Sequence, residues 1–164
     1  MRASPNLLAL TAVLAAAPAA AQQAPAASPA AIVGGVNACA EAMSPAGVDE
    51  AKLVAGGWSK ATASSNGKAV ALPLNIYGRD GVLVMVRPAG STPVGCLVTA
   101  QLSSAAQFPQ VATAFRGQFG QPVNNGKGET AYRLAGGKIV SLAPSGTPDK
   151  PAVRAIVVLP PPGK

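Results

Sequence analysis

The chain has 164 residues, with 13 lysines and arginines against 6 acids, and it has no histidine. The missing histidine excludes histidine-based triads, general bases and metal sites. Aromatic residues make up only 4% of the chain and are not interleaved with the basic ones, so nucleic-acid binding is not expected. No cofactor is predicted either, since Gly126-Lys127-Gly128 lacks the spacing and the Ser or Thr of a phosphate-binding loop.

The first 21 residues have the three parts of a secretory signal peptide. Arg2 precedes an apolar run over Leu7–Ala17, and small residues follow up to Ala21. The alternative, a membrane anchor, needs about 20 apolar residues, and no later segment is apolar enough to span a bilayer. We therefore predict a signal peptide over 1–21, cleavage before Gln22, and export to the periplasm or out of a bacterial cell.

The segments that flank the expected domain have biased compositions. Residues 22–35 begin with an uncharged stretch rich in Ala, Pro and Gln, which predicts a flexible leader. Residues 160–164 contain three consecutive prolines that cannot continue a helix or a strand. One domain over 36–159 remains, and its length is ordinary for a single folded unit.

The first half of this domain predicts helices followed by strands. Val36–Met43 indicates a short helix, and Ser44-Pro45 is typical of a new helix start that continues through Asp49–Ala55. Asp80-Gly81 is a hairpin signal. The strands expected on this side of the chain are Val70–Tyr77, interrupted by Pro73, then Val82–Arg87 and Cys96–Leu102.

The second half predicts one helix followed by three strands. Ser104–Gln107 matches a capping box, and apolar residues recur at helical spacing after it. Because of Pro109, the regular helix is expected to start only at about that residue. The stripe consists of Phe108, Val111, Ala112, Phe115 and Phe119. The expected strands are Thr130–Leu134, Lys138–Leu142 and Ala152–Leu159, with a turn-rich loop over Pro144–Pro151.

These elements predict an α+β fold in the order α-β-β-β-α-β-β-β, with an antiparallel sheet of five to six strands and two main helices. Two strands, Val82–Val86 and Ile156–Leu159, are apolar on both faces. Such strands are usually covered on both sides. Either one helix lies on each face, or the second face meets a second copy of the chain or another partner.

Cys39 and Cys96 are the only cysteines. In an exported protein an even pair predicts a disulfide, and the wide spacing and the lack of histidine argue against a redox or zinc role. If Cys39 lies on the first helix, that helix must cover the face of the sheet that holds Cys96. Val98 and Ala100 would share this face, while Thr99 and Gln101 would point away.

No residue is predicted to be catalytic. Ser65 and Lys68 match S-x-x-K, but Asn66-Gly67 between them indicates a turn, and the partner motifs are missing. Asp80 and Glu129 are the acids that a fold could bring together for glycosidase-like chemistry. Nothing in the sequence requires that they meet.

The basic residues offer one further hint. Five of them lie on or beside expected strands and are candidates for binding an anion or a partner: Arg79, Arg87, Arg133, Lys138 and Arg154. Anionic envelope polymers and acidic proteins are the partners that this charge would favour. The alternative is that scattered positive charges only keep an apolar chain soluble.

Three short motifs carry a resemblance. Cys39, the Gly-Gly-Trp at 56–58 and the Gly-Cys-Leu-Val at 95–98 before a helix resemble short exported bacterial proteins of unknown function, over about Cys39 to Gly120. The resemblance implies export and a disulfide, and it transfers no catalytic residue. Trp58, the only tryptophan, is expected at a junction between a helix and the sheet, although it could instead line a pocket.

The sequence therefore favours an exported, disulfide-bonded domain that binds or interacts at the cell envelope and is not an enzyme. Two alternatives stay open. One is an inhibitor of an exported hydrolase that uses the loop Gly120–Glu129. The other is a hydrolase that works without histidine.

Overall fold

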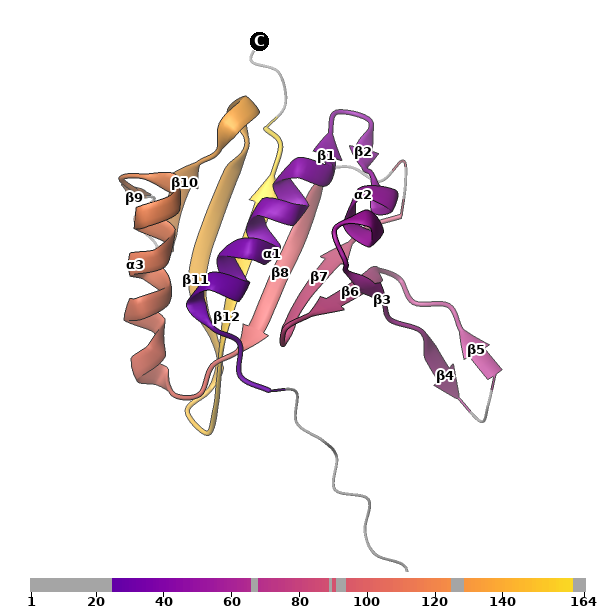
Figure 1. Ribbon diagram of the computed structural model, residues 1–164, viewed down its shortest axis with the longest axis horizontal. Helices are drawn as coiled ribbons and strands as arrows, with labels where there is room; N and C mark the ends of the chain where they lie inside the picture. The colour runs from indigo at the N-terminus through magenta and orange to yellow at the C-terminus, as the bar shows by residue number, and fades with distance from the viewer. Residues whose placement is uncertain (1–24, 66–67, 89, 91–93, 125–128, 161–164) are drawn as a thin grey trace, which may run out of the picture.

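The computed structural model describes residues 25–65, 68–88, 90, 94–124 and 129–160. The predicted signal peptide and most of the proline-rich tail lie outside these residues. The described residues form three α-helices and a large antiparallel sheet (Figure 1). This arrangement confirms the α+β class and the predicted disulfide.

The main sheet has eight strands in the order β3-β6-β7-β8-β12-β11-β10-β9, and the pairings between them are all antiparallel. Six of these strands are long, which agrees with the five to six expected, and the outermost strands have two residues each. The strands of the sheet are β3 (Ser59–Lys60), β6 (Asn75–Arg79), β7 (Val82–Val86), β8 (Gly95–Gln101), β9 (Val123–Asn124), β10 (Thr130–Arg133), β11 (Ile139–Thr147) and β12 (Lys150–Val158).

Three helices and two small hairpins complete the described fold. The helices are α1 (Pro29–Ala42), α2 (Glu50–Ala55) and α3 (Phe108–Phe119), and short 3-10 turns cover Ala105–Gln107 and Ala135–Gly137. The hairpins pair β1 (Met43–Ser44) with β2 (Gly47–Val48) and β4 (Ala63–Ser65) with β5 (Lys68–Val70). In Figure 1 the β4–β5 hairpin extends away from the rest of the molecule.

Helix α1 corrects the predicted leader over 22–35, because it begins at Pro29 rather than near Val36. The Oγ of Ser28 accepts a hydrogen bond from the Ala31 amide, and Pro29 stands in the first turn, where proline suits a helix. Ile32 and Val33 are buried against the sheet. Packing against the sheet therefore orders a stretch whose composition had indicated a linker.

Three other expectations were wrong in whole or in part. Ser44-Pro45 forms part of the β1–β2 hairpin and does not start a helix. The strand expected over Val70–Tyr77 is divided at Pro73, with β5 before it and β6 after it. The expected loop Pro144–Pro151 belongs largely to β11 and β12, which pair as far as Thr147 and Lys150. Pairing with a long neighbouring strand outweighs the turn propensity of proline and glycine there.

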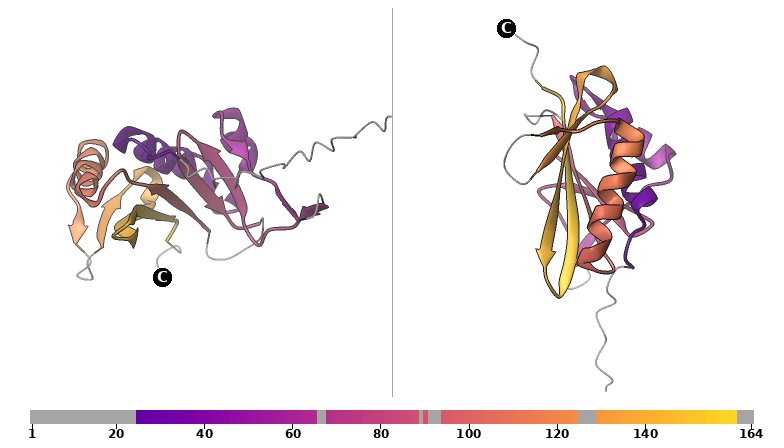
Figure 2. Two further views of the ribbon diagram at one scale, coloured as in Figure 1. Left: turned by 90° about the horizontal axis from the view of Figure 1, so that it is seen from below. Right: turned by 90° about the vertical axis from the view of Figure 1, so that its left-hand side faces the viewer.

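All three helices lie on one face of the sheet (Figure 2). Gly35 lets α1 approach closely, since a Cβ there would lie 2.9 Å from the Cγ1 of Val82 and 3.0 Å from that of Val98. Trp58 is 5% exposed and its ring lies beside Gly35, so the predicted helix–sheet junction is confirmed. Along the stripe of α3, Val111 and Phe115 are buried, and Phe115 contacts Tyr132 of β10.

The Cys39–Cys96 disulfide joins α1 to β8, with 6.2 Å between the two Cα atoms. As predicted, Val98 and Ala100 share the buried face with Cys96, while Thr99 and Gln101 are partly exposed. Of the two arrangements considered for the apolar strands, one helix on each face is not found among the described residues, whose helices all lie on one face.

Candidate functional site

The face of the sheet opposite the helices is the first candidate site, and we call it the open face. Along β7, Val82, Val84 and Val86 have no exposed surface, while Leu83 is 38% exposed and Met85 is partly exposed. The same alternation occurs in β8 and β12. Because neighbouring residues of a strand point to opposite faces, the partly exposed apolar residues of these strands belong to the open face.

The strand register places large apolar residues of the open face side by side. Ile76 of β6 pairs with Met85 of β7, and Met85 pairs with Leu97 of β8. Leu97 in turn pairs with Ile156 of β12. Residues directly opposite in neighbouring strands have Cβ atoms roughly 5 Å apart. These four residues therefore form a continuous apolar row across four strands.

A groove of about 290 Å³ lies along this row. Gly95 shares the open face with Leu97, and its missing side chain leaves the groove open, because a Cβ there would lie 3.4 Å from the Cγ1 of Val158 and 2.8 Å from the carbonyl oxygen of Val157. Nearly all of the lining is apolar, and Arg87 is its one charged residue. The lining residues are Leu74, Met85, Arg87, Gly95, Cys96, Leu97, Ile156 and Val158.

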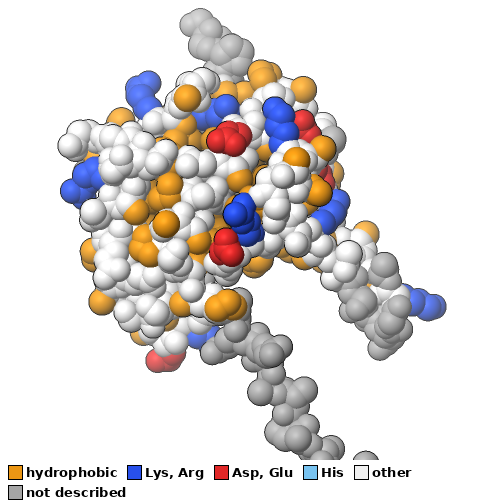
Figure 3. All heavy atoms as spheres, in the orientation of Figure 1, with side chains coloured by type: hydrophobic (Ala, Val, Ile, Leu, Met, Phe, Trp, Pro, Cys, Tyr) orange, Lys and Arg blue, Asp and Glu red, His pale blue; other side chains and the backbone are white. Residues whose placement is uncertain are grey.

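The charged residues in the long strands of the sheet are all positive. The six long strands β6, β7, β8, β10, β11 and β12 contain no acidic residue and four basic ones, Arg79, Arg133, Lys150 and Arg154. Arg154 lies on the open face and its Nη2 is 2.6 Å from the Oε1 of Glu129, just before β10. On the opposite, helix-covered side, Figure 3 shows acidic side chains next to basic ones.

The five predicted basic residues do not form one cluster. Arg133 and Lys138 are brought together, since both line a hollow of about 340 Å³ with Glu41 and Phe119. Arg87 and Arg154 belong to the open face. Arg79 points toward the helices, where its Nη1 donates to the Gly56 carbonyl at 2.6 Å and its Nε lies 3.3 Å from Asp80.

The largest hollow found, about 580 Å³, lies between α1, α2 and the β6–β7 turn. Trp58 and small residues of α1 form much of its wall, and Arg79 is held there by its contacts to Gly56 and Asp80. Its charged residues are Glu41, Lys52, Arg79 and Asp80, two of each sign. This hollow is of the size of a small-molecule site, but its charges balance.

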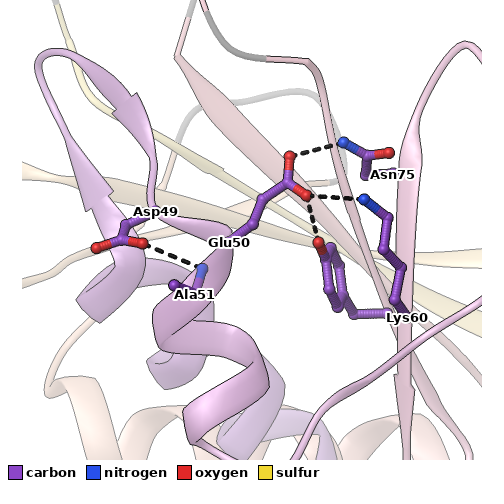
Figure 4. A network of polar contacts seen from close by, with 6 residues as sticks. Asp49, Glu50, Ala51, Lys60 and Asn75 are labelled. Atoms are coloured by element: carbon purple, nitrogen blue, oxygen red, sulfur yellow. Dashed lines mark hydrogen bonds and ion pairs between the residues drawn. The ribbon is translucent and has the colours of Figure 1, made fainter.

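A polar network holds α2 against the sheet, as Figure 4 shows. The carboxylate of Glu50 accepts hydrogen bonds from the Tyr77 hydroxyl, from Asn75 at 2.6 Å and from Lys60 at 3.2 Å. The Asp49 side chain caps the same helix by accepting from the Ala51 amide. Sequence reasoning placed these two acids only within a helical segment and missed the network, because its partners come from distant strands.

This network shifts two pKa values. Burial raises the pKa of Glu50, but the hydrogen bonds from Tyr77, Lys60 and Asn75 outweigh burial, so that the pKa lies below its ordinary value. Burial and the Glu50 contact raise the pKa of Tyr77 above its ordinary value. Neither residue lines the largest hollow. The arrangement therefore positions α2 rather than assembling reactive groups around that hollow.

The residue pairs considered for catalysis are not assembled. Asp80 lies in the β6–β7 turn and Glu129 lies beside β10, four to five strand spacings away, or roughly 20 Å at ~4.8 Å per spacing. Ser65 and Lys68 face each other across the β4–β5 hairpin and do not open a helix. In the candidate inhibitor loop Gly120–Glu129, residues 125–128 lie outside the described residues.

Two features are absent from the described residues. Among them, no group of three or more Cys, Asp or Glu side chains is placed to hold a metal ion. No helix in that part of the chain is both long and apolar enough to cross a membrane.

No protein-family model, no curated protein and no solved structure matches this chain significantly. The residues and geometry described above are therefore the basis for any statement about function.

Proposed function

We propose that this protein is an exported, non-enzymatic binding module of the cell envelope, and that the open face is its binding surface. The single observation that carries the proposal is the apolar row Ile76–Met85–Leu97–Ile156, on a face that no helix of the described residues covers. Exposed apolar patches on soluble proteins commonly mark interaction sites. The signal-peptide pattern at the N-terminus supports export, and the disulfide is compatible with it.

The structure gives less support to the two alternative functions, a hydrolase and an inhibitor. A hydrolase without histidine would need a pocket with converging polar groups, and the candidate pairs Asp80/Glu129 and Ser65/Lys68 lie on separate parts of the fold. The inhibitor hypothesis would need an ordered protruding loop, and the centre of Gly120–Glu129 is outside the described residues.

The test is site-specific photo-crosslinking of the mature protein in cells, with the photoreactive residue at one of two positions. Leu83 lies on the open face and Val54 on α2, and both are exposed apolar side chains. The proposal predicts specific adducts from position 83 and none from position 54. Equal labelling from both positions would contradict it.

A second measurement addresses the surface itself. The purified protein should bind an environment-sensitive apolar dye, and Leu83→Lys should reduce this binding while Val54→Lys should not. A soluble monomer in light scattering with no dye-accessible apolar patch would refute the proposal.

A further inference from the structure

The groove on the open face combines an apolar wall with a cationic rim. Leu74, Met85, Leu97, Ile156 and Val158 supply the wall, and the exposed residue Arg87 supplies the charge. A surface of this kind matches a ligand that is apolar along its length and anionic at one end. We infer that the groove binds a single-chain anionic amphiphile, with the hydrocarbon chain along the apolar row and the headgroup at Arg87. The inference rests on the proposed function, because it uses the same face.

The charge of the sheet favours an anion. The six long strands carry no acid that would repel a negative headgroup. Among the described residues, the acid that lies next to Arg154 on the open face is Glu129. It forms an ion pair with Arg154. A guanidinium has five N–H donors in a planar fork, so Arg87 can hold a carboxylate through two hydrogen bonds while keeping other contacts.

The size of the groove sets the length of the chain. Its volume of about 290 Å³ lies at the lower end of the range of small-molecule sites. A medium-length fatty acid is therefore the simplest ligand that would fill the groove and reach Arg87.

A second copy of the chain is a weaker occupant. In a dimer formed by two open faces, the two Arg87 side chains and two strand surfaces without acids would lie in one interface. Like charges would then face each other. Packed protein interiors also leave few voids larger than a water molecule, and each copy would have to fill the groove of the other. The flexible chain of an amphiphile fills the groove without this requirement.

The first experiment is displacement of a fluorescent fatty-acid probe from the mature protein by straight-chain carboxylates of increasing length, each below its micelle concentration. Affinity should rise about fourfold for each methylene buried. It should stop rising once the chain fills the groove. Leu97→Trp, which fills the groove, should weaken binding at least tenfold, and Val54→Trp on α2 is the matched control that should not.

The second experiment tests the headgroup. Arg87→Gln should weaken carboxylate binding about tenfold or more, as expected for loss of a charge-assisted pair. The same variant should leave binding of the alcohol of equal length unchanged. Arg116→Gln on α3 is the control for a lost positive charge, and thermal unfolding of each variant verifies that it is folded.

Several results would overturn the inference. These are no probe displacement at any chain length, affinity that keeps rising past the groove length, binding unaffected by Leu97→Trp, or binding only to vesicles of anionic phospholipid. A dimer that buries the open face and excludes the probe would also overturn it. Specific protein adducts from position 83 without amphiphile binding would overturn this inference and leave the proposed function standing.

Discussion

Gly35 of α1 lies directly over Val82 of β7, so close that a Cβ on the glycine would come within 2.9 Å of the valine Cγ1. The helix therefore lies on the sheet without a side chain between them at this position. Gly34, the preceding residue, points outward and has no atom within 4 Å of a Cβ placed on it. The two neighbouring glycines provide a matched pair for testing how α1 packs.

Gly35→Val should destabilise the protein by about 1–3 kcal/mol, because the added side chain forces α1 away from Val82 and Val98. Gly34→Ala should be neutral or stabilising by up to about 1 kcal/mol, since alanine favours helix and meets open space. Urea unfolding followed by Trp58 fluorescence measures both. Equal effects of the two substitutions would contradict this packing.

Removing the disulfide should lower the free energy of unfolding by about 4 kcal/mol in the chain-entropy model, since the bond links residues 57 positions apart. The double variant Cys39→Ala/Cys96→Ala should unfold at a lower urea concentration than the oxidised wild type. Adding reductant should shift the wild type toward the variant and leave the variant unchanged. No such shift would mean that α1 is held on β8 by packing alone.

Two neighbours on β7 should respond differently to shortening. Val84 is fully buried under the helices, so Val84→Ala should cost about 2 kcal/mol through lost burial and a cavity. Leu83 is 38% exposed on the open face, so Leu83→Ala should cost less than about 1 kcal/mol although it removes more atoms. Denaturant unfolding compares them. A larger loss for Leu83→Ala would show that the open face is covered in the free protein.

Glu50 should make stability sensitive to acid. Its pKa is lowered in the folded protein, so its contribution is present above the unfolded value of about 4.3 and is lost as the pH falls through the folded value. Glu50→Gln should therefore show a weaker loss of stability between neutral pH and acid than the wild type. Glu41→Gln, which alters an exposed carboxylate on α1, is the control and should keep the full acid dependence.

The tyrosine hydroxyls should ionise at a higher pH than in an unfolded chain. Tyr77 and Tyr132 are the two tyrosines of the chain. Burial and the contact with Glu50 raise the pKa of Tyr77, and burial raises the pKa of Tyr132. The tyrosinate absorbance of the native protein should therefore appear above the ordinary value of about 10. The stability that protonated Tyr77 contributes is complete below that value and is lost as the pH rises through the folded pKa. Tyr77→Phe should remove one late-titrating group, and a normal titration in the folded wild type would contradict the network.

Part of the candidate site was predictable from the sequence. The apolar character of Val82–Val86 on both faces indicated a face that needs a cover, and the helices of the described residues cover the other face. The five basic residues were also named as candidates from the sequence, and the structure distributes them over separate parts of the fold. Their positions depend on which strands are neighbours, and Arg79 shows this, because the alternation of β6 turns it toward α2 and Gly56.

Local patterns in the sequence were enough to predict the α+β class, six of the strands, the helix carrying the phenylalanines, and the disulfide. These features depend on residue spacing and on turn residues that act over a few positions. The start of α1, the continuation of β11 and β12 through the prolines, the contacts of Glu50 with Tyr77, and the groove beside Gly95 were visible only in the folded chain. Each of them comes from contacts between segments far apart in sequence, since local spacing specifies which side of a strand is apolar but not what lies against that side.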